Sequence, residues 1–116
     1  MNKIIKGNLR QLDREKIIEQ IVDFLKLKTE IVEVYLFGSF STLEYTDDSD
    51  IDLLIVAKTN LSFPSRPLLY AELLDVYAPM DILVYTPEEF SRNLAAQNHG
   101  FWNQFKASQK LIYKST

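Results

Sequence analysis

Residues 31–57, IVEVYLFGSFSTLEYTDDSDIDLLIVA, decide the fold of this 116-residue chain. An apolar segment rich in β-branched and aromatic residues, 31–37, ends at Gly38-Ser39, and Asp50-Ile51-Asp52 opens a second apolar segment. Residues two apart in a strand project from the same face, so the two carboxylates are expected side by side. The unbroken apolar run behind them predicts a strand that is buried on both faces.

Two carboxylates held this close repel each other in a low-dielectric site, and a cation between them removes the repulsion. Because every ligand would be an oxygen, Mg²⁺ fits best, since it binds through one or two carboxylates and completes its shell with water and phosphate oxygens. A Gly-Ser turn directly after a strand can bring backbone N–H groups and a hydroxyl to a phosphate. The stretch therefore predicts a phosphate site at Gly38 and Ser39 beside a metal site at Asp50 and Asp52.

Gly38-Ser39, followed after ten residues by Asp50-Ile51-Asp52, resembles the signature of the DNA polymerase beta-like nucleotidyltransferases, and most closely their smallest branch, the minimal nucleotidyltransferases. That family carries a third carboxylate on a later strand, and Asp81 stands where the resemblance places it. The resemblance covers nearly the whole chain. It implies that Asp50, Asp52 and Asp81 form one catalytic and metal-binding group, with Gly38 and Ser39 as the nucleotide-binding residues.

The resemblance also implies a function. Two Mg²⁺ ions would bridge the carboxylates and the triphosphate of ATP, with Asp81 close enough to act as the base. Minimal nucleotidyltransferases are typically encoded beside a HEPN-type ribonuclease toxin, and the best described act as antitoxins by transferring AMP from ATP to a tyrosine of that toxin. We therefore expect an antitoxin-type protein adenylyltransferase whose partner is a HEPN-type toxin.

One stretch departs from the family pattern. Close relatives usually carry arginine just after Gly-Ser, where its charge steadies the triphosphate, but residues 40–43 here are Phe-Ser-Thr-Leu. The charge would then come from the metals, from a distant base such as Lys58 or Arg66, or from a partner. Two alternatives stay open: a catalytically weak or inactive antitoxin that neutralises its toxin by binding, and a nucleotidyltransferase for a small molecule such as an aminoglycoside.

Composition bounds the remaining possibilities. A length of 116 residues predicts one nucleotidyltransferase domain over residues 1–116. The net charge is −3, and residues 30–57 hold seven acids and no Lys or Arg, which argues against direct nucleic-acid binding. There is no cysteine, so disulfides and thiolate zinc sites are excluded. With no apolar leader and no membrane-length run, we expect a cytoplasmic protein without membrane contact; a homo- or hetero-oligomer is possible.

The apolar periodicity predicts alternating helices and strands. Helices are expected over 13–28, 68–76 and about 101–106, with another starting at Thr86-Pro87; strands over 31–37, 50–57, 80–85 and 110–113; and a short helix or loop over 40–49 and a loop over 58–67. In the helix over 68–76, Leu69, Leu73 and Val76 are expected to point inward. The alternation predicts an α/β fold, a small mixed sheet backed by helices, and the resemblance implies the polymerase beta-like nucleotidyltransferase fold.

Overall fold

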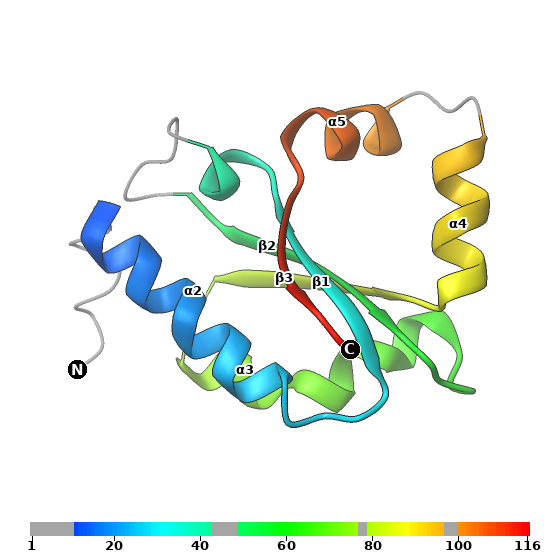
Figure 1. Cartoon of the computed structure of the whole chain (residues 1–116), viewed down its shortest axis with the longest axis horizontal. Coiled ribbons are helices and arrows are strands. Elements are labelled where there is room, and N and C mark those ends of the chain that lie inside the picture. Colours follow the sequence, from blue (N-terminus) through cyan, green and yellow to red (C-terminus); the bar gives the residue numbers. More distant parts are fainter. Residues whose placement is uncertain (1–10, 43–48, 77–78, 97–99) are drawn as a thin grey trace.

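The computed structural model describes residues 11–42, 49–76, 79–96 and 100–116 (Figure 1). Its elements, in chain order, are α2 (Gln11–Leu25), β1 (Ile31–Phe37), the 3-10 turn η1 (Ser39–Ser41), β2 (Ile51–Ala57), the 3-10 helix η2 (Phe63–Tyr70), α3 (Glu72–Val76), β3 (Met80–Tyr85), α4 (Pro87–Ala95), α5 (Phe101–Ser108) and β4 (Lys110–Lys114). The four predicted strands are confirmed to within one residue at each end. The prediction for 40–49 falls partly on 43–48, outside the described residues. None of the described helices has the length and apolar character needed to cross a membrane.

The four strands form one sheet in the order β3-β2-β1-β4. β1 lies antiparallel to both β2 and β4, whereas β2 and β3 are parallel. A parallel pair needs a crossover connection, which η2 and α3 supply between β2 and β3. The predicted small mixed sheet with helices is therefore confirmed.

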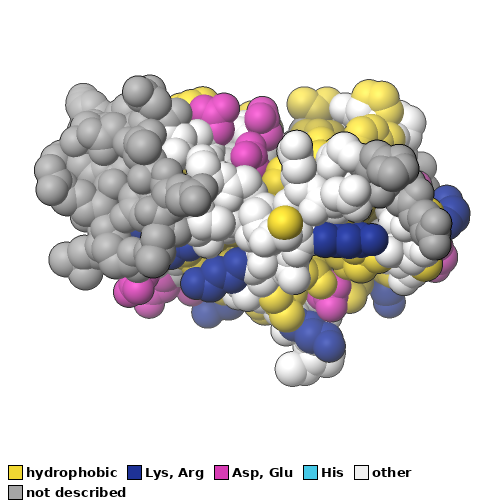
Figure 2. Space-filling model, turned by 90° about the horizontal axis from the view of Figure 1, so that it is seen from above, with side chains coloured by type: hydrophobic (Ala, Val, Ile, Leu, Met, Phe, Trp, Pro, Cys, Tyr) yellow, Lys and Arg dark blue, Asp and Glu magenta, His cyan; other side chains and the backbone are white. Residues whose placement is uncertain are grey.

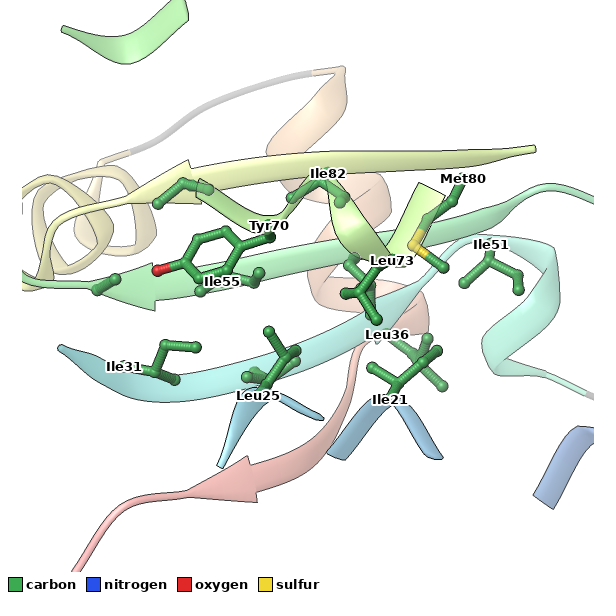
Figure 3. Packing of buried hydrophobic residues seen from close by; sticks show 14 of the residues in the cluster. Ile21, Leu25, Ile31, Leu36, Ile51, Ile55, Tyr70, Leu73, Met80 and Ile82 are labelled. Carbon is green, nitrogen blue, oxygen red and sulfur yellow. The ribbon is translucent and has the colours of Figure 1, made fainter. Parts of the chain in front are cut away.

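One face of the sheet is covered by α2, η2 and α3. Ile17, Ile21 and Leu25 recur every four residues along α2, so they share one face of the helix, and all three are buried. Figure 3 shows Ile21 and Leu25 together with Leu36 of β1 and Leu73 of α3 in this layer of the core. The apolar stripe of the first helix is thus the packing surface that holds it on the sheet.

The opposite face is covered by α4 and α5, which lie on the other side of the sheet from α2 and α3 in Figure 1. Phe90 of α4 and Trp102 and Phe105 of α5 pack against Leu54 and Val56 of β2. Every residue of β2 from 53 to 57 is buried, so burial of this strand on both faces is confirmed.

The crossover between β2 and β3 differs from the prediction. Part of the expected loop and the start of the expected helix over 68–76 form η2, a 3-10 helix that contains Pro67. Proline has no N–H for an α-helical hydrogen bond, which favours short 3-10 segments here. The tighter winding changes which side chains face inward: Tyr70 is fully buried and Leu69 is 38% exposed, whereas Leu73 is buried as predicted.

Candidate active site

The acidic residues Asp52 and Asp81 come to the same end of the sheet, where β2 and β3 begin. They are register partners in the parallel pair, so their side chains lie on one face of adjacent strands. On the other side of Asp52, its partner in the antiparallel pair is Phe37, the last residue of β1. We call Phe37, Asp52 and Asp81 the acid row; it runs across three strands on the face that α4 and α5 cover. Asp50 precedes β2 and is exposed.

The acid row carries unbalanced negative charge. Burial, together with repulsion from the carboxylates of Asp81 and Asp50, raises the pKa of Asp52 from 3.8 to about 6. Within the described part of the chain, the carboxylates of Asp50, Asp52 and Asp81 form no ion pair with Lys or Arg. The three carboxylates therefore interact electrostatically with one another and lack a described cationic partner.

Gly38 joins the acid row to the turn that follows β1. Its backbone has φ 76° and ψ −163°, a conformation that side chains with a Cβ rarely adopt. A Cβ at this position would lie 2.5 Å from Oδ2 of Asp52, closer than any van der Waals contact. The backbone of the turn thus lies directly against the Asp52 carboxylate, and only glycine leaves room for it.

Ser39 is exposed on the same turn, and its hydroxyl lies 3.0 Å from the hydroxyl of Ser49, just before Asp50. This hydrogen bond connects the two segments that the sequence motif contributes. The predicted nucleotide residues, Gly38 and Ser39, are therefore placed next to the predicted metal ligands Asp50 and Asp52.

Ser108, at the end of α5, holds the turn from the helix side. Its hydroxyl oxygen accepts a hydrogen bond from the Gly38 N–H at 2.9 Å and donates to the Gln104 carbonyl at 3.0 Å. The Ser41 hydroxyl lies 2.6 Å from the Ser108 carbonyl and 2.7 Å from the Gly38 carbonyl. The Gly38 N–H is therefore already bonded within the protein, and sequence reasoning missed this contact because nothing in the local pattern marks Ser108.

Arg14 was also missed, because in the sequence it looks like an ordinary polar position of the first helix. It is 4% exposed, and its Nε donates to the Phe40 carbonyl at 2.7 Å. Its guanidinium lies 5.5 Å from the centre of the Phe40 ring. Arg14 thus holds η1 from the first helix.

The distant bases Lys58 and Arg66 lie at the wrong end of the sheet to serve the acid row. Arg66 donates to both carboxylate oxygens of Glu89, at 2.7 and 3.1 Å, and to the Val84 carbonyl near the end of β3. Lys58 follows the last residue of β2, six residues after Asp52, which is about 20 Å along an extended strand. The expectation that either could neutralise the triphosphate is therefore wrong for this arrangement.

The donor set of the acidic end fits Mg²⁺. Asp50, Asp52 and Asp81 all offer carboxylate oxygens, the ligands that Mg²⁺ prefers. Burial and the neighbouring carboxylates raise the pKa of Asp52, and a bound cation would offset both effects. As they stand, the described residues contain no group of three His, Cys, Asp or Glu side chains gathered tightly enough to hold an ion. Asp50 and Asp81 are exposed, so their side chains can turn toward a cation without disturbing the core.

Two sequence relationships accompany this geometry. The profile of the family described as Polymerase beta, Nucleotidyltransferase matches residues 19–115. A Methanocaldococcus jannaschii protein, provisionally named a protein adenylyltransferase, is 39% identical over 54 residues, which make up 45% of this chain and 54% of that protein. The match to this curated relative thus covers only about half of its length.

Solved structures share the fold. A Sulfolobus solfataricus protein, provisionally a nucleotidyltransferase, superposes with a TM-score of 0.57 and 24% identity, covering 98% of this chain and 88% of that one. A chain in the complex of a tri-AMPylated Shewanella oneidensis HEPN toxin with an MNT antitoxin superposes with a TM-score of 0.55 and 20% identity, covering 88% of this chain and 73% of that one. A chain in a toxin–antitoxin structure with AMP-PNP superposes with a TM-score of 0.52 and 22% identity, covering 84% of this chain and 73% of that one. At these identities the likeness is one of fold.

Proposed function

This chain belongs to the polymerase beta nucleotidyltransferase family, and we propose that it is an antitoxin-type adenylyltransferase that moves AMP from ATP to a tyrosine hydroxyl of a partner HEPN-type toxin. The observation that carries the proposal is the acid row, in which Asp52 lies between Asp81 and the backbone of Gly38. Support for a protein acceptor comes from the relative named a protein adenylyltransferase. Support for a HEPN-type acceptor comes from the structural neighbour whose toxin carries AMP.

In this proposal Asp50, Asp52 and Asp81 would hold two Mg²⁺ ions, which would neutralise charge on the triphosphate and lower the pKa of the attacking hydroxyl. The acceptor oxygen forms a bond to the α-phosphorus of ATP, and the bond from that phosphorus to the oxygen bridging to the β-phosphate breaks. Pyrophosphate leaves with the electron pair. The hydroxyl proton passes to the carboxylate of Asp81, which is exposed and can release it to solvent.

The turn after β1 has two separate tasks in this proposal. Gly38 contributes space, because its own N–H is bonded to Ser108 and its missing Cβ lets the chain lie against Asp52. Ser39 contributes a donor: its exposed hydroxyl exchanges its bond with Ser49 for one to a phosphate oxygen. The nucleotide site therefore depends on the hydroxyl of Ser39 more than on the N–H of Gly38.

A second function is favoured by one observation. Arg66 is bound to Glu89 and Lys58 stands beyond the far end of β2, so neither supplies the positive charge that close relatives place after Gly-Ser. If triphosphate binding is correspondingly weak, the chain would neutralise its toxin by occupying it, without transferring AMP. The two functions differ in whether neutralisation needs the carboxylates.

Intact-mass spectrometry separates the two functions. The protein is mixed with the HEPN-type product of its neighbouring gene, Mg²⁺ and ATP, beside the variants Asp52→Asn and Asp23→Asn. Asp23 is an exposed acid of α2 paired with Lys26, so Asp23→Asn controls for loss of an acid elsewhere. We expect whole AMP units on the partner with the native chain and with Asp23→Asn, and none with Asp52→Asn. A stable complex without any mass change would overturn transfer and support inhibition by binding.

A further inference from the structure

The aromatic side chains of α5 divide into two buried rings and one exposed ring. Trp102 and Phe105 are 8% and 1% exposed, and their contacts with α4 and β2 account for them as core. Phe101, in the first turn of the same helix, is 36% exposed. Packing in the core therefore explains the aromatic residues at 102 and 105 but does not fully explain the phenylalanine at 101.

Phe101 stands over the end of the acid row. Its ring meets the Phe37 ring edge to face, with centroids 5.5 Å apart and planes at 87°. Phe37 is the register partner of Asp52, and partners on neighbouring strands have side chains in contact distance. The ring of Phe105 lies nearly parallel to that of Phe101, at 22° and 6.3 Å, and supports it from the core side.

Trp102 contacts the Phe101 ring edge to face, with centroids 5.1 Å apart, but extends toward the far end of β3 rather than toward the acids. Its ring contacts Tyr85 at 5.2 Å, and Tyr85 is the last residue of β3, at the opposite end of that strand from Asp81. Figure 2 shows the face of the molecule seen from above, where acidic side chains gather beside a group of hydrophobic side chains. Apolar and acidic side chains are thus neighbours on this face.

We propose that Phe101, supported by Phe37 and Phe105, is the platform on which the base of the bound nucleotide stacks. The inference rests on the proposed function and deepens it. A nucleotide with its triphosphate on the Gly38 turn and its α-phosphorus at Asp52 has its base beside the acid row, where Phe101 is the exposed ring. Aromatic side chains stack on any base, because every base offers a π-face. Phe101 therefore adds affinity for nucleotides without choosing among the bases.

The test compares two ligands that share phosphates and differ in the base. Isothermal titration calorimetry in Mg²⁺ measures ATP and inorganic tripolyphosphate against the native chain, Phe101→Ala and Phe101→Leu. Leucine keeps an apolar contact with Phe37 but removes the flat ring. We expect both variants to bind ATP about tenfold or more weakly, the range that one base–aromatic stack supplies, with tripolyphosphate affinity unchanged. Phe101→Trp keeps a stacking face and should restore ATP binding.

Phe63→Ala is the matched control. Phe63 is also an exposed phenylalanine, at 41%, but its ring packs on Tyr85 at 5.1 Å, away from the acid row, so ATP binding should not change. Equal weakening of ATP and tripolyphosphate by Phe101→Leu would overturn the platform and leave a packing role. Unchanged ATP binding with reduced transfer to the partner would assign the ring to the acceptor instead. If the native chain bound neither ligand, the proposed function itself would fail.

Discussion

Gly38 is glycine for two reasons that can be separated by experiment. Its φ of 76° strains any residue with a Cβ, and that Cβ would also collide with Asp52 Oδ2 at 2.5 Å. Gly100 has a similar φ of 66°, but a Cβ there meets no atom within 4 Å. Substitutions at Gly38 and Gly100 therefore distinguish the effect of backbone strain from the effect of displacing Asp52, a proposed metal ligand.

We predict that Gly38→Ala and Gly100→Ala each lower the free energy of unfolding, by about 1–3 kcal/mol, since strain at such backbone angles is of that size. Only Gly38→Ala should also abolish Mg²⁺-dependent ATP binding, because its Cβ pushes the Asp52 carboxylate away. Chemical denaturation and calorimetry measure the two effects. Retained ATP binding in Gly38→Ala would show that the close approach of this turn to Asp52 has no part in the site.

Asp52 stabilises the fold in acid and destabilises it at neutral pH. Its folded-state pKa of about 6 lies above the ordinary 3.8, so between these values the folded chain holds a proton that the unfolded chain has released. The free energy of unfolding therefore falls as pH rises from about 4 to about 6 and then levels off. Because Asp52 is partly exposed, solvent screening reduces this contribution to the order of 1 kcal/mol.

At the scale of elements, an ion pair between buried Arg66 and half-buried Glu89 fixes the end of the sheet that is remote from the acid row. The Arg66 side chain of η2 is 8% exposed, and besides Glu89 it binds the Leu61 and Val84 carbonyls. Glu89 also accepts from the Thr86 N–H at 2.9 Å and, with Thr86, forms the capping box that starts α4. The Arg66–Glu89 pair thus ties η2, β3 and α4 together. The sequence predicted the start of the helix at Thr86-Pro87 but not this ion pair.

We predict that Arg66→Ala lowers the free energy of unfolding by about 1–3 kcal/mol, because Glu89 loses its ion pair and the Leu61 and Val84 carbonyls lose a donor. The hydrogen bonds from Arg66 and from the Thr86 N–H lower the pKa of Glu89 to about 2, so the stabilisation they provide is present above about pH 4.5 and is lost as pH falls toward 2. Urea denaturation across this pH range measures both.

Lys58→Ala is the control, as an exposed position that should change stability by less than about 0.5 kcal/mol. Neither variant should change ATP affinity at a temperature where it remains folded, since both residues lie away from Asp52. A specific loss of ATP affinity in folded Arg66→Ala would contradict the placement of Arg66 at the structural end of the sheet.

For the whole molecule, the sequence predicted what depends on local periodicity. The apolar runs gave the strands, and the four-residue spacing in α2 gave its packing face. The crossover was less predictable, because its 3-10 winding changes which of Leu69 and Tyr70 faces the core. The 3-10 helix η2 contains Pro67, and the effect of a proline on helix winding depends on the surrounding contacts.

The candidate site divides in the same way. The family resemblance implied that Asp52 and Asp81 would meet, and the parallel register brings them side by side. The contacts that hold the site from outside the motif were invisible in the sequence, since Ser108 lies 70 residues from Gly38 and Arg14 lies 26 residues from Phe40. Such contacts depend on how whole elements pack, and a short window of sequence carries no record of that.

The most direct test of the central claim, a cation site at the acid row, is a ¹³C NMR titration of the Asp52 carboxyl with and without Mg²⁺. Asp52→Asn assigns the signal. Without Mg²⁺ we predict a midpoint near pH 6, because burial and the neighbouring carboxylates disfavour the charge. With Mg²⁺ the midpoint should fall well below that value, while the carboxyl signal of Asp23 on α2 stays unaffected by the ion. A midpoint for Asp52 that Mg²⁺ leaves unchanged would contradict the claim.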